Sequence, residues 1–119
     1  MLYTLENEKI KITISNQGAE LHNIKSKVDG IEYLWNRNKR YWGYSAPVLF
    51  PIVGKVNNGS YKVDGKEYNL PQHGLARLKE FEMIKKTDDN IIFELVDSEE
   101  TLKVYPYKFS LYSYGKGFK

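Results

Sequence analysis

The sequence contains no cysteine, only two histidines and no long apolar run. The missing cysteine excludes disulfides, cysteine nucleophiles and thiolate zinc sites. No stretch approaches the roughly 20 apolar residues that a membrane-spanning helix needs. The first six residues have neither the basic start nor the apolar stretch of a signal peptide. We therefore expect a cytoplasmic protein with no membrane partner.

The length and composition fit a soluble globular protein. The 119 residues predict one domain, 1–119, and the shares of hydrophobic (41%) and charged (28%) residues are typical of such domains. The net charge of +3 is too small to indicate nucleic-acid binding by itself. Residues 101–119 hold four lysines and no acid, so removing their charge from the total leaves −1 for the first hundred residues.

One irregular segment, residues 36–44, combines cations with aromatic rings, which are the ingredients of single-strand nucleic-acid binding. Its basic residues do not cluster along one predicted strand face, so we expect no nucleic-acid partner. The residues concerned are Arg37, Lys39, Arg40, Tyr41 and Trp42.

Apolar residues recur with a period of two, which is typical of strands with one buried face. Ile10, Ile12 and Ile14 alternate with polar residues. Residues 60–63 and 66–70 flank Asp64-Gly65, a dipeptide that favours tight hairpin turns. This hairpin is the clearest element that the sequence predicts.

The same pattern predicts further strands and no helix of three turns. The remaining expectations are a strand over 19–28 paired with 31–35, a strand over 80–86 paired with 91–96, strands over 102–105 and 109–112, and a polar turn or short helical start at 98–100. Many short strands joined by tight turns indicate an all-β fold, an antiparallel β-sandwich or barrel. Aromatic residues make up 14% of the chain, which suits a sheet whose surface grips flat ligands, or simple packing within sheets.

His73 is the strongest candidate for a binding residue in the sequence. It lies at a chain break, Pro71-Gln72-His73-Gly74, and Arg77 follows four residues later. A neutral imidazole donates one hydrogen bond and accepts another, which matches a sugar hydroxyl, whereas an arginine fork suits paired oxygens or a phosphate. A histidine that only stabilises a turn is the alternative at this position.

Other constellations are weaker. His22 lies within a predicted strand, where an exposed or edge side chain is the simplest interpretation. Two distant histidines without clustered carboxylates do not make a metal site. Gly54-Lys55 lacks the glycine-rich lead-in and the following Ser or Thr of a phosphate loop. We therefore expect neither a metal nor a cofactor.

An ordered set of short segments resembles the aldose 1-epimerase (galactose mutarotase) family, and most closely its LacX-like branch. The resemblance runs from about residue 1 to residue 112, and its most specific part is 46–77. The matching segments are 18–21 (Gly-Ala-Glu-Leu), 32–35 (Glu-Tyr-Leu-Trp), 41–42 (Tyr-Trp), 46–54 (Ala-Pro-Val-Leu-Phe-Pro-Ile-Val-Gly), 61–77 (ending Leu-Pro-Gln-His-Gly-Leu-Ala-Arg) and 105–107 (Tyr-Pro-Tyr).

This resemblance implies the amino-terminal portion of a large β-sandwich, the galactose mutarotase-like supersandwich, with a hexose on its concave face. In that family a carboxylate removes the proton of the anomeric hydroxyl while a histidine protonates the ring oxygen. The ring opens and recloses on the other face, which interconverts the α and β anomers by general acid–base catalysis without a cofactor.

The resemblance also implies substrate-binding roles for three residues. His73 matches a family histidine that hydrogen-bonds sugar hydroxyls near the ring oxygen. Lys55 falls where mutarotases usually have an arginine, so a point charge replaces a planar fork. Arg77 belongs to the His-Gly-Leu-Ala-Arg stretch shared with the hexose-6-phosphate epimerase branch, in which arginines help to hold phosphate.

The sequence departs from the family in length. The family's general-acid histidine and general-base glutamate lie beyond the last residue, so we assign no catalytic residue in this chain. After Leu111 the likeness stops, and residues 113–119 form a divergent basic, glycine-rich tail.

Three hypotheses follow. The first is an aldose 1-epimerase-like protein, or its sugar-binding part, that is inactive alone and binds a hexose or a hexose phosphate. A hexose-6-phosphate 1-epimerase-like protein is its alternative. The second is a non-catalytic carbohydrate-binding or interaction module. Because half a sandwich leaves sheet edges unpaired, a homo-oligomer is expected with either of these. The third is nucleic-acid binding, which the scattered basic residues disfavour.

Overall fold

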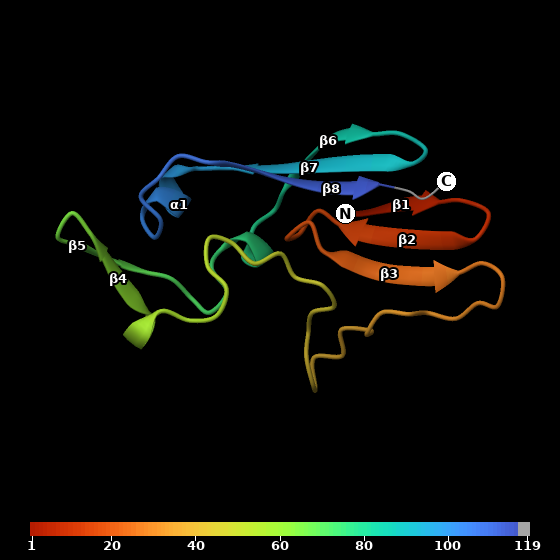
Figure 1. The fold of residues 1–119 in the computed structure, drawn as a ribbon, viewed down its shortest axis with the longest axis horizontal. Helices are drawn as coiled ribbons and strands as arrows, with labels where there is room; N and C mark the ends of the chain where they lie inside the picture. Colours follow the sequence, from red (N-terminus) through yellow and green to blue (C-terminus); the bar gives the residue numbers. More distant parts are fainter. Residues whose placement is uncertain (117–119) are drawn as a thin grey trace.

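The computed structural model describes residues 1–116 and contains two three-stranded antiparallel sheets and a separate hairpin (Figure 1). In the first sheet the strand order follows the sequence: β1 (Leu2–Glu6), β2 (Ile10–Ser15) and β3 (Leu21–Ser26). The isoleucine alternation lies in β2, at the centre of this sheet. The predicted strand there is confirmed.

The second sheet is built from the last third of the chain. Its strands are β6 (Glu82–Lys86), β7 (Asn90–Val96) and β8 (Ser110–Lys116), with β7 in the middle. The predicted pairing of 80–86 with 91–96 is confirmed. The strand expected over 109–112 runs on to Lys116, so part of the predicted tail 113–119 belongs to β8, while residues 117–119 lie outside the described chain.

The two sheets pack face to face and enclose the core. Tyr3 of β1 meets Phe93 of β7 edge to face, with 5.5 Å between ring centroids. Phe81, Ile91 and Phe93 are fully buried, and each such side chain stabilises the fold by about 1.5–3 kcal/mol. The antiparallel β-sandwich expected from the sequence is confirmed.

The separate hairpin comprises β4 (Ser60–Val63) and β5 (Lys66–Asn69). Asp64 and Gly65 both have positive φ, 50° and 78°, as a two-residue turn that matches the twist of the strands requires. The predicted hairpin is confirmed. It leads directly into the 71–74 break that carries His73.

Short helical turns fill some of the connections. Helix α1 (Glu99–Leu102) begins after Ser98, whose side chain accepts from the Thr101 amide while Thr101 caps Ser98 in return. The short helical start expected at 98–100 is therefore confirmed, because Ser98 supplies the first-turn acceptor. Ala76–Leu78 forms a single 3₁₀ turn. No helix within residues 1–116 is long and apolar enough to cross a membrane.

One strand prediction holds only in part and another is wrong. Residues 31–35 form a short bridge to β3, Lys25 opposite Glu32, in which the Ser26 amide donates to the Ile31 carbonyl and the Tyr33 amide donates to the Ile24 carbonyl. The pairing goes no further, because the Glu32 carboxylate accepts the amides of Ile24 and Leu34. Residues 102–105 continue from α1 as a turn in which the amides of Val104 and Tyr105 donate to the Thr101 carbonyl.

Candidate functional site

His73 is held by two hydrogen bonds to one glycine. Its backbone N–H donates to the Gly54 carbonyl at 2.7 Å, and the Gly54 N–H donates to its Nδ1 at 2.9 Å. The residue has φ of 66°, a left-handed conformation that is uncommon for residues other than glycine. This double contact fixes the ring relative to the segment that precedes Lys55.

The Gly54 contact also decides which ring nitrogen carries the proton. Nδ1 accepts a hydrogen bond, so a neutral His73 must carry its proton on Nε2. Within residues 1–116 no group is hydrogen-bonded to Nε2. The ring therefore offers one oriented N–H donor, which suits a hydroxyl or ring oxygen of a ligand.

Gly74 anchors the turn that carries His73. A Cβ at this position would lie 2.2 Å from the Phe50 carbonyl oxygen, so no other residue fits there. The amides of Leu75 and Ala76 donate to that same oxygen, at 2.8 and 3.1 Å. The His-Gly pair is thereby fastened to the 46–54 segment, and the backbone rather than a flexible side chain sets the position of the imidazole.

The structure brings Lys55 near His73 only through the backbone. Lys55 directly follows Gly54, its side chain is exposed, and its ammonium forms no ion pair with any residue of the described chain. A long exposed cation can reach a ligand held by a neighbouring group, but its position is not fixed. The substrate-binding role of Lys55 stays a prediction.

Arg77 is held more firmly. Its Nη2 donates to the Gln72 carbonyl at 3.0 Å, and its guanidinium lies over the Tyr44 ring, 4.8 Å from the centroid. Its Nε is buried and has no hydrogen-bond partner among the described residues. Arg77 is thus tied to the residue before His73 on one side and to the 36–46 segment on the other.

An open hollow of about 730 Å³ lies beside Arg77. Three cations, one acid and a tyrosine ring contribute to its lining. The lining residues are Ser15, Gln17, Glu20, His22, Asn36, Arg37, Lys39, Gly43, Tyr44 and Arg77. The sequence alone indicated no role for Glu20, and it indicated Arg37 only as a candidate for nucleic-acid binding.

Glu20 is the buried acid of this hollow, and both of its oxygens are occupied. Oε1 lies 3.1 Å from His22 Nε2, while Oε2 accepts the amides of Ser45 and Ala46 at 3.0 and 3.2 Å. A buried carboxylate that satisfies two backbone donors stabilises the chain path there. The sequence did offer one sign of this role, because Glu20 is an acid between two apolar residues at the start of a predicted strand. Its partner Ser45, however, lies 25 residues further along the chain.

His22 lies at the edge of the first sheet, as the sequence indicated, and contacts Glu20. Burial and the nearby Arg37 charge lower the pKa of His22, and together they outweigh the opposing effect of the Glu20 carboxylate. The imidazole is therefore neutral near pH 7. It lies beside Glu20 rather than across a ligand-sized space from it, so the two do not form an acid and base on opposite sides of a sugar.

Arg37 closes this cluster with a left-handed backbone, φ 60°. Its Nη1 donates to the His22 carbonyl at 2.5 Å and lies 3.5 Å from Ser45 Oγ. The cation that a nucleic-acid site would need is thus turned inward. Within residues 1–116 no group of three or more acidic or histidine side chains could hold a metal ion.

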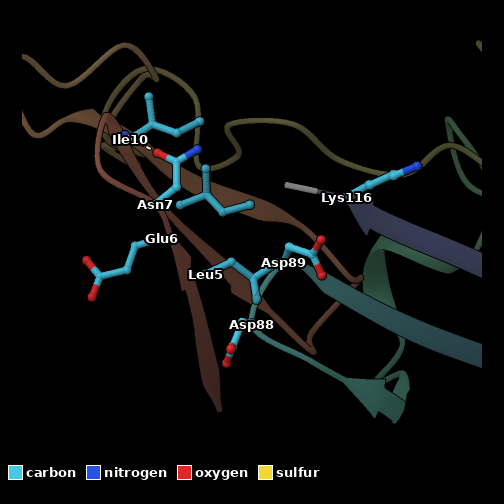
Figure 2. A pocket seen from close by; sticks show the side chains of 8 residues that line it. Leu5, Glu6, Asn7, Ile10, Asp88, Asp89 and Lys116 are labelled. Carbon is cyan, nitrogen blue, oxygen red and sulfur yellow. Dashed lines mark hydrogen bonds between the residues drawn. The ribbon is translucent and has the colours of Figure 1, made fainter. Parts of the chain in front are cut away.

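A second, apolar gap lies between the sheets at their far end (Figure 2). Leu5, Ile10 and Ile12 line it, and Asp88 and Lys116 stand at its rim. Its volume of about 60 Å³ is too small for a hexose. We regard it as the incompletely filled end of the sandwich.

Comparison with known proteins identifies one family. The model of the aldose 1-epimerase family matches residues 1–112. The chromosomal and plasmid LacX proteins of Lactococcus lactis subsp. lactis are both 33% identical over 116 residues, which cover 93% of this chain and 38% of theirs.

Solved structures agree on the fold. A galactose mutarotase related enzyme from Lactobacillus acidophilus superposes with a TM-score of 0.98 at 47% identity over 99% of this chain and 39% of its own. A galactose mutarotase-like protein from Lactobacillus casei gives 0.92 at 38% identity over 96% of this chain and 39% of its own. The chain thus spans about two fifths of these relatives and corresponds to their amino-terminal part. With the family match over residues 1–112, it belongs to the aldose 1-epimerase family.

Proposed function

We propose that this chain binds a hexose through His73 and does not interconvert anomers by itself. One observation carries the proposal: Nδ1 of His73 accepts from Gly54, so Nε2–H is an oriented donor. A sugar hydroxyl or ring oxygen is the complementary acceptor. Lys55, one residue beyond Gly54, is the cation that would reach the same ligand.

The absence of turnover follows from the chemistry of the reaction. Moving a proton off the anomeric hydroxyl and another onto the ring oxygen takes two titratable groups on different sides of the sugar. In the hollow beside Arg77, the carboxylate and the imidazole are those of Glu20 and His22, and they contact each other. Glu20 is further occupied by two backbone amides.

Calorimetric titration with glucose and galactose tests binding. We expect measurable affinity in the unchanged chain, loss of it in His73→Ala, and retention in Gln72→Ala, whose exposed side chain makes no hydrogen bond in the described chain. Equal affinity in all three chains would refute the role of His73.

Polarimetry on freshly dissolved α-glucose tests turnover separately. We expect the buffer rate in the presence of the chain, as for a non-catalytic carbohydrate-binding module. A rate well above buffer that disappears in His73→Ala would refute the claim of inactivity and leave the binding site intact.

A hexose phosphate is the second candidate ligand, favoured by the cations of the hollow. Lys39 and Arg77 line the hollow and form no ion pair within residues 1–116. Phosphate oxygens would accept hydrogen bonds from the N–H groups of these two cations that face the hollow.

The comparison of glucose 6-phosphate with glucose by titration tests this candidate. Tighter binding of the phosphate, weakened in Arg77→Lys, would support it, because the lysine keeps the charge but loses the fork. Equal affinities for the two sugars would contradict it.

A further inference from the structure

Strand β8 is an open edge of the second sheet. It pairs along its whole length with β7, from Val96 opposite Ser110 to Asn90 opposite Lys116, and no other described strand is hydrogen-bonded to it. An unpaired edge presents a row of backbone N–H and C=O groups to any extended chain.

The opposite edge of the same sheet, strand β6, has features that block pairing with another strand, whereas β8 does not. Strand β6 carries a bulge between Met83 and Lys85, and its exposed residues include Glu82, Lys85 and Lys86. Bulges and charges are the devices that block edge pairing. Strand β8 is regularly paired and carries one charge, Lys116, while Tyr112 and Tyr114 on its outer face are 45% and 70% exposed.

In the first sheet, the part that would face a strand added next to β8 is also left uncovered. Phe93 of β7 contacts Tyr3 of β1, and Gly115 of β8 lies against Ile14 of β2. By this stacking, a strand added beside β8 would lie over β3. There Ile24, paired with Ile12 and facing the core side with it, is only half-buried and outside the core cluster.

A second copy of this chain cannot pair with the β8 edge in this way. Two identical edge strands pair antiparallel around a two-fold axis perpendicular to the sheet. That axis would carry the copy's β2, which lies beneath its own β8, into the space that β3 already occupies. The occupant must bring a strand with no second layer beneath it at this point.

We propose that the edge of β8 and the uncovered Ile24 bind in trans a polypeptide corresponding to the part of the family domain that this chain does not contain. The solved relatives superpose on this chain with about three fifths of their own length left over. That length holds ample chain for a strand here, with apolar side chains toward Ile24 and its outer ones beside Tyr112 and Tyr114. Binding is by strand addition and does not depend on the proposed sugar site.

Co-expression tests the proposal with the remainder of the Lactobacillus acidophilus relative as the probe. We expect a 1:1 complex by sedimentation and protection of β8 amides from hydrogen exchange. Ile24→Lys should weaken it at least about ten-fold, because it places a charge in the apolar contact. Val28→Lys, at a residue that is 82% exposed, is the matched control and should have no effect.

The positive control is the relative's own amino-terminal part with the same remainder. If that pair associates and this chain does not, or if Ile24→Lys leaves the complex unchanged, the proposal is overturned. If the control pair does not associate, the test uses residues 1–112 fused to the remainder. Stronger protection of β8 amides in the fusion than in the lone chain, together with a larger fall in Tm for Ile24→Lys than for Val28→Lys, supports binding at β8 and Ile24. Equal protection or equal falls overturn it.

Discussion

The two sheets and the long segment between the first sheet and the hairpin, residues 27–59, are held together in different ways. In the sheets, buried side chains such as Ile91 and Phe93 interlock across two layers. The connecting segment contains no strand, and side chains fasten its backbone: Glu20 accepts from Ser45 and Ala46. The difference teaches that stability resides in the sandwich, while the geometry near the candidate site depends on a few polar anchors.

Phe93→Ala should be the most damaging change. Removing a fully buried aromatic ring costs about 3–5 kcal/mol, because the cavity and the lost contacts add. Chemical denaturation followed by circular dichroism measures it. Tyr114→Ala on the exposed face of the same sheet is the control, with an expected change within about 0.5 kcal/mol. Similar losses for both would deny that the layered core carries the stability.

Glu20→Gln should have a smaller effect, confined to the connecting segment. The neutral amide keeps the shape but weakens the acceptor of two backbone donors, which costs about 1–3 kcal/mol. Hydrogen exchange should become faster at Ser45 and Ala46 and stay unchanged in β7. Glu67→Gln, at an exposed position of β5, is the matched control. Uniformly faster exchange would show that the two regions are not separable.

The pH dependence of stability should reveal His22. Its pKa is lowered in the folded chain, so the unfolded chain binds more protons in this range and stability falls as the pH drops below the usual value of 6.5. The stabilisation is fully present above pH 6.5 and is lost toward the lowered pKa. The free energy of unfolding is measured between pH 7.5 and 5.5 for the unchanged chain and for His22→Gln, and the difference between the two profiles isolates this contribution. A difference of opposite slope would contradict the assigned direction.

Lys55→Ala should have the smallest effect on stability, within about 0.5 kcal/mol, because the side chain is exposed and unpaired within residues 1–116. Sugar affinity should nevertheless fall. Lys62→Ala, another exposed lysine, should change neither. Titration and thermal melting of the same samples check both quantities, and unchanged affinity in Lys55→Ala would remove it from the site.

Local chemistry was enough to predict some elements. The hairpin around Asp64-Gly65 needs only neighbouring residues, and so does the Ser98 cap of α1. The strand over 31–35 is limited to a short bridge, because the Glu32 carboxylate accepts the amides of Ile24 and Leu34. Strand β1 was missed because its short alternation, Tyr3 and Leu5, gains meaning only when β2 pairs with it.

The same division holds for the site. His73 stood out by its chain break and by the family resemblance, but the proton position on its ring depends on Gly54, 19 residues away. The Glu20, His22 and Arg37 cluster was not foreseen, because its bonds to Ser45 and Ala46 join distant parts of the chain. Alternation and turns specify strands, whereas these anchors follow from tertiary structure.

The protonation of the His73 ring tests the central claim most directly. A long-range ¹H–¹⁵N correlation spectrum distinguishes the two ring nitrogens, and His22→Gln assigns the signals. The account predicts a proton on Nε2, an unprotonated Nδ1, and a shift of the Nε2 signal when galactose is added. A proton on Nδ1, or an Nε2 signal indifferent to sugar, would contradict it.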